Sequence, residues 1–246
     1  MSRVLAFRAA GRPTGRLIGQ GLGLPFGSCA FHTRTKGAWE IAIRWDCVDN
    51  PERETANTLN KSNAIRGASG KLGSFREFRD AGVPIPRFTA SRDEARAWQE
   101  DGSTVFGRTT EGFQGRGISV YNPLDSLGQH PLFVEFIPNE REYRLHVVRG
   151  VVVSLQRKYP TRPGSDGRDH IKNHANGYVF KTPEKGLNTS RNQAAIAAVN
   201  ALGLDFGAVD LIVDHDGKEY VLEVNTAPAL SPLRIEQYVA ALRPLL

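Results

Sequence analysis

Hydrophobic and polar positions divide the chain into short strands and helices that are interspersed along its length. Alternating runs rich in β-branched and aromatic residues predict strands, and apolar positions at helical spacing predict helices. Strands are expected at residues 4–8, 39–45, 132–137, 209–213 and 219–224, with strand pairs within 105–120 and 144–155. Helices are expected at residues 14–24, 62–81, 92–100, 191–202 and 233–242. This mixture predicts an α+β fold.

Glycine and proline positions suggest where the chain is divided. The stretch "AGVPIPRF" ends the helix of residues 62–81, because Gly82 is a C-cap signal and Pro84 and Pro86 forbid further helix. We expect a hinge there, within a chain of three parts: a small N-terminal lobe (1–61), a connecting helix with a glycine-containing lobe (62–131), and a last lobe (132–246). The run "GQGLGLPFG" (19–27) is expected to be a turn-rich connector, since no clear strand leads into it.

Composition narrows the class of protein. The 246 residues are 40% hydrophobic, which is enough for a core, yet no apolar run is long enough to cross a membrane. The apolar run 4–7 is too short for a signal peptide. Cys29 and Cys47 make neither a disulfide framework nor a zinc site, so a reduced, cytoplasmic protein is expected. The net charge of +6 favours polyanionic partners such as nucleotides or nucleic acid, or simply reflects an arginine-rich surface.

Two carboxylates are predicted to meet in the hairpin "AVDLIVDHDGKEYVLEVN" (208–225). With Asp216-Gly217 as the turn, Asp210 lies directly opposite Glu223, and Asn225 shares the face of Glu223. Directly opposed like charges are destabilising, and a hard divalent cation offsets them. Oxygen ligands suit Mg²⁺ or Mn²⁺. The alternative is that both acids face solvent on an edge hairpin.

The same residues carry a family resemblance. "VDLIV" followed by "VLEVNTAP" resembles the C-terminal signature of ATP-grasp ligases, and is similar to that of ribosomal-protein glutamate ligases and D-alanine–D-alanine ligases. The resemblance implies an ATP-grasp architecture, in which a small N-terminal α/β lobe precedes two α+β lobes that clamp ATP. It also implies two magnesium ions, held by Asp210, Glu223 and Asn225 against the phosphates. The chain departs from the pattern after the proline, where Pro228-Ala229 replaces Pro-Gly.

A glycine-rich loop lies in "RTTEGFQGRGISV" (108–120). Closely spaced glycines between two strands allow backbone N–H groups to approach phosphate oxygens, although such loops are common. The stretch resembles the phosphate-covering loop of the family, with Arg108 in place of the usual lysine. The positions that the resemblance assigns to ATP here are Arg108, Gly112, Gln114, Gly115 and Gly117.

The rest of the nucleotide site is also assigned by resemblance. In "VEFIPNEREYRLHVV", residues Glu135, Phe136 and Ile137 match the linker that binds adenine through its backbone, and Glu142 matches the ribose ligand. Lys71 falls on the lysine that reaches the ATP phosphates. Without the resemblance, these residues read as a charged exposed turn and a solvated lysine.

Cations for activating an acid are expected on the following strands. Arg144 lies on an otherwise apolar strand, and Arg157 and Lys158 end the next one, so that together they bind a carboxylate and the transferring phosphoryl group. The loop "HIKNHANG" (170–177) resembles one that borders the acceptor, with Asn173 and His174 as candidates. A solvated loop histidine is the alternative for His174.

These inferences predict an ATP-dependent carboxylate–amine ligase. A carboxylate attacks the γ-phosphoryl group to give an acylphosphate and ADP, and an amine then displaces phosphate to form an amide. An ATP-grasp phosphotransferase and a non-catalytic ATP sensor are the alternatives, and nucleic-acid binding does not exclude ligase activity. An amino acid, a peptide end or an acidic polymer is the expected substrate class, and the oligomeric state stays open.

Overall fold

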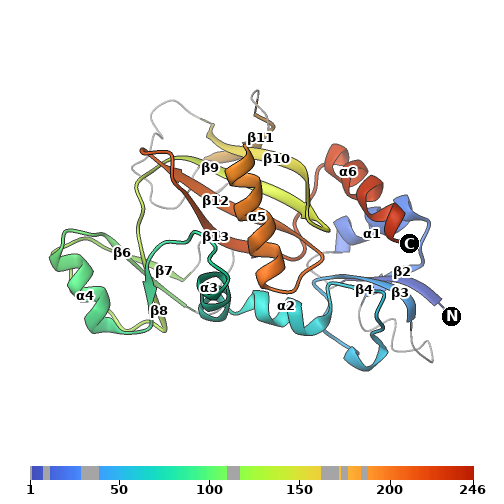
Figure 1. The fold of residues 1–246 in the computed structure, drawn as a ribbon, viewed down its shortest axis with the longest axis horizontal. Coiled ribbons are helices and arrows are strands. Elements are labelled where there is room, and N and C mark those ends of the chain that lie inside the picture. The colour runs from blue at the N-terminus through green and yellow to red at the C-terminus, as the bar shows by residue number, and fades with distance from the viewer. Residues whose placement is uncertain are drawn as a thin grey trace.

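A computed structural model describes residues 2–7, 12–28, 39–109, 117–161, 172, 177–183 and 188–246. Within these ranges the chain forms three β-sheets that follow one another in sequence, each with its own helices (Figure 1). We call the parts built on these sheets the first, middle and last lobes. The mixed helices and sheets confirm the predicted α+β class. None of the described helices is long and apolar enough to cross a membrane.

The first lobe is a small parallel sheet. Its strands are β1 (Ser2–Phe7), β2 (Phe26–Ser28), β3 (Trp39–Trp45) and β4 (Thr58–Leu59), in the order β2-β1-β3-β4. Helix α1 (Arg12–Leu22) precedes β2, and the short 3-10 helix η3 (Pro51–Arg53) precedes β4. All three pairings in the sheet are parallel, so the ends of β3 and β4 point the same way, toward the last lobe.

The glycine-rich connector predicted at residues 19–27 is wrong in its first half, because α1 continues to Leu22. Close packing explains the glycines. A Cβ on Gly19 would lie 2.7 Å from Cβ of Phe26, and a Cβ on Gly21 would lie 2.6 Å from Cγ2 of Val239. The glycines therefore let α1 pack tightly against its neighbours.

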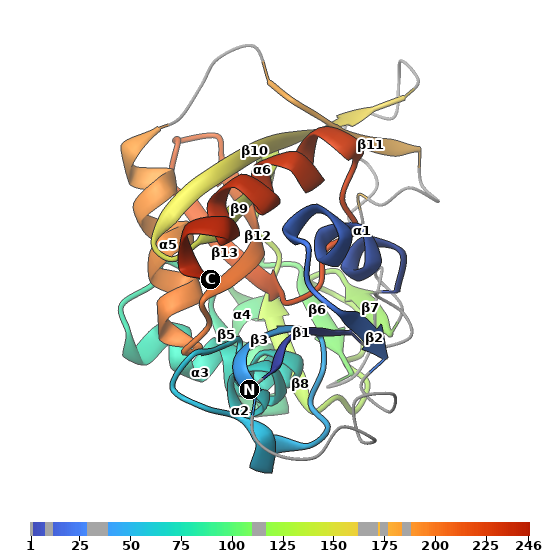
Figure 2. The same cartoon turned by 90° about the vertical axis from the view of Figure 1, so that its right-hand side faces the viewer.

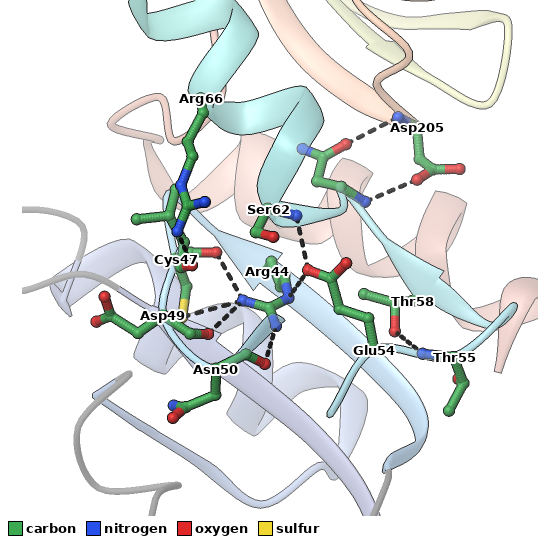
Figure 3. Close-up of polar contacts among 12 residues, drawn as sticks. Arg44, Cys47, Asp49, Asn50, Glu54, Thr55, Thr58, Ser62, Arg66 and Asp205 are labelled. Carbon is green, nitrogen blue, oxygen red and sulfur yellow. Dashed lines mark hydrogen bonds and ion pairs between the residues drawn. The ribbon is translucent and has the colours of Figure 1, made fainter. Parts of the chain in front are cut away.

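A buried arginine organises the loop that leaves β3. Arg44 is fully buried, and its Nη1 donates to the carbonyls of Cys47 (3.0 Å) and Asp49 (2.7 Å), while Nη2 donates to that of Asn50 (2.9 Å) (Figure 3). Glu54 neutralises the guanidinium at 2.9 Å. Cys47 is disulfide-bonded, which contradicts the expectation of a reduced chain. The loop is thereby fixed at several points.

The middle lobe is an antiparallel sheet with two helices leading into it. Helices α2 (Ser62–Ser69) and α3 (Lys71–Asp80) replace the single predicted helix, which breaks at Gly70. The strands are β5 (Phe88–Thr89), β6 (Val105–Arg108), β7 (Ile118–Tyr121) and β8 (Leu132–Glu135), in the order β5-β8-β6-β7. Helix α4 (Arg92–Glu100) packs on this sheet through Ala95 and Trp98.

The last lobe is a five-stranded antiparallel sheet of order β11-β10-β9-β12-β13. Its strands are β9 (Asn139–Val148), β10 (Val151–Pro160), β11 (Tyr178–Lys181), β12 (Phe206–Asp214) and β13 (Glu219–Asn225). Helix α5 (Thr189–Ala201) covers one face, and α6 (Pro232–Leu242), which ends in the 3-10 helix η4 (Arg243–Leu245), packs on the other beside α1 (Figure 2). Arg149 and Gly150, both with positive φ, form the β9–β10 turn.

The first lobe is joined to the last lobe by polar and aromatic contacts. The Asn60 side chain accepts from the backbone N–H groups of Asp205 (2.8 Å) and Phe206 (3.1 Å), and donates to the Phe206 carbonyl (2.9 Å). Trp45 stacks on Phe206 with ring centroids 5.3 Å apart. Asp46 accepts a hydrogen bond from Thr226, the residue after Asn225. These contacts bring the end of β3 next to the end of β13.

Candidate active site

The predicted carboxylate pair is confirmed: Asp210 on β12 lies directly opposite Glu223 on β13. The turn differs from the predicted two-residue turn, because Asp214 donates its N–H to the Lys218 carbonyl (3.0 Å) and three residues close the hairpin. Gly217, with φ of 84°, takes the left-handed position that such a loop requires. A β-bulge between Asp210 and Leu211 then restores the predicted pairing.

Asn225 completes an oxygen-rich group. It follows Glu223 by two residues on the same strand, and its Oδ1 accepts the N–H of Ala227 (2.9 Å), which turns the chain toward Pro228. Among the described residues, no group of three or more His, Cys, Asp or Glu side chains is placed to hold a metal. The candidate ligands are therefore the carboxylates of Asp210 and Glu223 and the side-chain amide of Asn225. Their oxygen atoms fit a hard divalent cation whose further ligands come from phosphate or water.

Arg144 compensates the buried carboxylate of Asp210. Its Nε and Nη2 donate to Oδ1 (2.6 Å) and Oδ2 (2.7 Å) of Asp210, and its guanidinium lies 4.4 Å from the ring centroid of Phe180. Burial opposes ionisation of Asp210, but the charge and hydrogen bonds of Arg144 outweigh burial and lower the Asp210 pKa. Each carboxylate oxygen keeps a lone pair, so the ion pair is compatible with metal binding.

Glu142 and Lys158 form a second buried ion pair on the same face of the sheet. The Lys158 ammonium also lies 5.1 Å from the Phe180 ring centroid. Burial raises the pKa of Glu142, and the charge of Lys158 opposes this shift. The structure thus joins the predicted ribose ligand to a predicted catalytic cation.

Two further cations lie near Glu223. Burial lowers the pKa of Lys71 on α3 and of Arg108 on β6, and in both cases the negative charge of Glu223 opposes the shift. These three side chains come from α3, β6 and β13, so the middle and last lobes meet at this point. Positive charge beside paired carboxylates is suited to a metal–phosphate group.

The base of the glycine-rich loop is fixed by Gly117. Its carbonyl accepts the N–H of Thr109 (3.1 Å), and its φ of 76° lies in the region that favours glycine. A Cβ at this position would lie 2.3 Å from Oγ1 of Thr109. The other loop candidates, Gly112, Gln114 and Gly115, lie outside the described residues.

The predicted adenine linker follows β8. Arg87 holds the Glu135 side chain at 2.8 and 2.7 Å, and these hydrogen bonds lower the Glu135 pKa. The backbone N–H of Glu135 donates to the Arg87 carbonyl, and that of Phe136 donates to the Thr104 carbonyl, each at 2.9 Å. These two N–H groups therefore already have hydrogen-bond partners within the middle lobe. The backbone carbonyls of the linker and Ile137 are left to contact an adenine base. Arg87 is not among the predicted site residues, although "IPRF" places it beside the predicted hinge.

Arg157 lies on the opposite face of the sheet from Lys158, another of the predicted cations. It pairs with Tyr143 on β9, whereas its neighbour Lys158 pairs with Phe180 on β11. Successive residues of a strand point to opposite faces, so the expectation that Arg157 and Lys158 act together is wrong. Arg157 instead lies 5.0 Å from the Tyr159 ring. Asn173 and His174 lie outside the described residues.

The architecture matches known enzymes along nearly its whole length. No family model matches the sequence. A solved structure of the ATP-grasp ligase PsnB with a minimal precursor superposes with a TM-score of 0.73, 13% identity, and coverage of 100% of this chain and 99% of PsnB. D-alanine–D-alanine ligase from Bacillus anthracis superposes with a TM-score of 0.67 and 14% identity, covering 98% of this chain and 92% of that enzyme. The chain therefore has the ATP-grasp fold.

Sequence similarity relates the chain to glutamate ligases. A probable alpha-L-glutamate ligase of Haemophilus influenzae (strain Rd) is 30% identical over 188 residues, which is 70% of this chain and 59% of that relative. The matched part thus spans somewhat more than half of the relative's length. The resemblance to glutamate ligases and D-alanine–D-alanine ligases that the sequence motifs predict is confirmed.

Proposed function

We propose that the chain is an ATP-dependent carboxylate–amine ligase. The observation that carries the proposal is the group centred on Asp210 and Glu223, which face each other and lie beside Arg144, Lys71 and Arg108. Two opposed carboxylates supply a cation site, and the basic side chains supply charge for phosphate oxygens. Phosphoryl transfer depends mainly on such positioning and charge neutralisation.

Each part of the group has a role in this proposal. Asp210, Glu223 and Asn225 hold Mg²⁺ (or Mn²⁺), which neutralises phosphate charge when it is bound. A structure of PsnB contains Mg and ADP, which supports this cofactor. Lys71 and Arg108 contact the phosphates. Lys158 and Arg144 orient the attacking carboxylate and stabilise charge on the transferring phosphoryl group.

The chemistry follows from the two substrates. A carboxylate oxygen attacks the γ-phosphorus of ATP, so that ADP leaves and an acylphosphate forms. An amine nitrogen then attacks the acyl carbon, loses a proton and expels inorganic phosphate, leaving an amide. The names of the relatives, a probable glutamate ligase and a ligase solved with a precursor, favour an amino acid or peptide as substrate.

Nucleotide products test the proposal. The protein is incubated with Mg-ATP and a pool of amino acids and peptides, and ADP, AMP and phosphate are quantified. Glu223→Ala is the test variant, and Glu236→Ala, which changes an exposed acid on α6, is the matched control. Equal amounts of ADP and phosphate that depend on the pool and on Glu223 support the ligase.

Other product patterns argue against it. ADP without phosphate indicates a phosphotransferase, and AMP contradicts the acylphosphate route. Full turnover by Glu223→Ala would contradict the assignment of Glu223 as a metal ligand. ATP binding without any turnover, measured by calorimetry, favours a sensor.

A further inference from the structure

Arg157 and Arg191 lie on the face of the last sheet that is turned away from the candidate active site. Arg157 pairs with Tyr143 across β10 and β9, and the guanidinium of Arg191 lies 3.9 Å from the Tyr143 ring centroid. Tyr143 belongs to the core beneath α5, so both arginines are on the α5 face of the sheet (Figure 1). Arg144 and Lys158, which follow Tyr143 and Arg157 in the chain, point to the opposite face.

Neither of these guanidinium groups has a polar partner among the described residues. Arg191 is only 8% exposed, and its Nε is buried without a hydrogen bond. The Nε of Arg157 is buried in the same way. Within the described ranges neither arginine forms an ion pair, and each instead lies against a tyrosine ring. Burying a cation without a counter-ion is unfavourable, so an anion that reached these groups would be stabilising.

A third cation lies directly opposite Arg157. Lys181 on β11 is the cross-strand partner of Arg157, and its side chain is exposed. Like charges that face each other across two strands destabilise a sheet. Arg157 therefore has a positive charge on one side and the Tyr143 ring, with Arg191 over it, on the other.

Two acids of the same sheet already have other partners. Glu140 forms an ion pair with Arg141 at 2.5 Å. The hydrogen bond from Arg141 lowers the Glu140 pKa most, and the charge of Arg157 adds a smaller effect. Glu219 on β13 accepts a hydrogen bond from Ser190 at 2.5 Å. Within the part of the chain that the structure describes, the three cations therefore share this face without a carboxylate that pairs with any of them.

The start of α5 adds partial positive charge at the same place. Asn188 caps the helix by accepting the N–H of Arg191 (3.0 Å), and the first turn contains no acidic residue. The N–H groups of Thr189 and Ser190 have no partner within the helix, and both residues are exposed. Helical side chains lean toward the N-terminus, which places the Arg191 guanidinium at this end of α5. Such a helix end favours anions, phosphate above all.

We propose that Arg157, Lys181 and Arg191, together with the N-terminus of α5, bind a phosphate group on the face of the last lobe opposite the candidate active site. A phosphoryl group carries a charge of about −1.5 to −2 at pH 7, so it matches three cations better than a singly charged carboxylate does. Free inorganic phosphate and the phosphoryl group of a phosphorylated peptide present the same oxygens. The inference does not depend on the proposed ligase function, because none of these side chains belongs to the group around Asp210 and Glu223.

Binding is tested by thermal unfolding in increasing orthophosphate, with chloride at matched ionic strength as reference. Arg157→Gln and Lys181→Gln are the test variants, and Arg96→Gln, which changes an exposed arginine on α4, is the matched control. Lys71→Gln reports on phosphate that binds at the candidate active site instead. A short phosphoserine peptide and its unphosphorylated form are compared with orthophosphate.

Orthophosphate is expected to raise the melting temperature of the wild type, of Arg96→Gln and of Lys71→Gln. Arg157→Gln and Lys181→Gln should each need at least about tenfold more phosphate for the same rise, because each loses a charge-assisted contact. Without phosphate, Lys181→Gln should melt no lower than the wild type, since it removes one of two opposed like charges.

The absence of a phosphate-specific rise in the wild type overturns the proposal, and so does an equal rise in both test variants. A rise that Lys71→Gln loses and Arg157→Gln keeps also overturns it, because the phosphate is then bound at the candidate active site. An equal effect of the phosphoserine peptide and its unphosphorylated form excludes a phosphorylated peptide as the ligand. If the phosphoserine peptide acts at lower concentration than orthophosphate, the site is confirmed and the ligand is a phosphorylated partner.

Discussion

Arg144 and Asp210 face each other across β9 and β12 and form a two-point ion pair, with N–O distances of 2.6 and 2.7 Å. Both side chains are largely buried. The pair therefore holds a carboxylate ionised inside the protein, at a position where the proposed function requires a metal ligand. We expect this ion pair to contribute to the free energy of unfolding when no nucleotide is bound.

Arg144→Met is expected to destabilise the protein by about 3 to 5 kcal/mol, because it leaves the buried Asp210 charge without a partner. Urea unfolding without ligand measures the change. Arg141→Met, which breaks an exposed ion pair with Glu140, should leave the stability nearly unchanged. Mg-ADP should recover more stability in Arg144→Met than in the wild type. Equal costs for the two variants would contradict the role given to Arg144.

Stability is expected to fall in mild acid because of His146. This residue is fully buried between Tyr238 (3.1 Å) and Gln156 (2.9 Å), and burial lowers its pKa to about 4. The unfolded chain, with a histidine pKa of about 6.5, binds the proton more tightly. The stabilisation is therefore complete above pH 6.5 and is lost as pH falls toward 4, with a total of about 3 kcal/mol.

The His146 contribution is isolated by comparison with a variant. The free energy of unfolding is measured between pH 4 and 7.5 for the wild type and His146→Gln. His215→Gln, which changes an exposed histidine, serves as the control. The slope in this range should shrink only in His146→Gln. A slope unchanged by that substitution would show that other groups control the acid response.

Gly117→Ala is expected to weaken the base of the glycine-rich loop. Its positive φ and the contact with Thr109 both disfavour a side chain, and the left-handed conformation alone costs about 1 to 2 kcal/mol. Gly73→Ala is the matched control, since Gly73 lies in α3 with open space around its Cβ position. That change should stabilise the protein by up to about 1 kcal/mol. Urea unfolding measures the stability of both variants. If Gly117→Ala is as stable as the wild type, the predicted backbone strain is refuted.

Asn60→Ala is expected to loosen the joint between the first and last lobes. It removes three hydrogen bonds and leaves buried N–H and carbonyl groups of residues 205 and 206 unpaired, a cost of about 3 kcal/mol. Asn57→Ala, at an exposed position, should be nearly neutral. Unfolding in urea gives both values. Equal stability of the two variants would mean that the joint depends on aromatic packing alone.

The sequence predicts the carboxylate pair because local rules are strong there. A hairpin signal and strand alternation are enough to place Asp210 opposite Glu223. The turn has one more residue than predicted, and the bulge beside Leu211 moves the register back. Such a bulge is a response to packing, which no dipeptide pattern reports. The correct pairing thus came from two departures that offset each other.

Other differences have separate physical causes. Strand alternation already implies that Arg157 and Lys158 point apart, so this error was avoidable from the sequence. The helix predicted to residue 24 and the connector predicted from residue 19 overlap, and the sequence could not decide between them, because Gly21 packs against Val239, which is far away in the chain. Phe180 could not be placed for the same reason, since its partner Arg144 lies on a strand that is distant in sequence.

The joint between the first and last lobes has a consequence for motion. Trp45, Asn60 and Phe206 tie these two lobes together, and α2 and α3 contribute Ile65 and Phe78 to the core beneath α5. The sheet of β5 to β8 has its own hydrophobic clusters. A movement that brings Arg108 toward a bound nucleotide is therefore expected to displace this sheet as one unit. The first and last lobes would stay fixed relative to each other while the sheet moves.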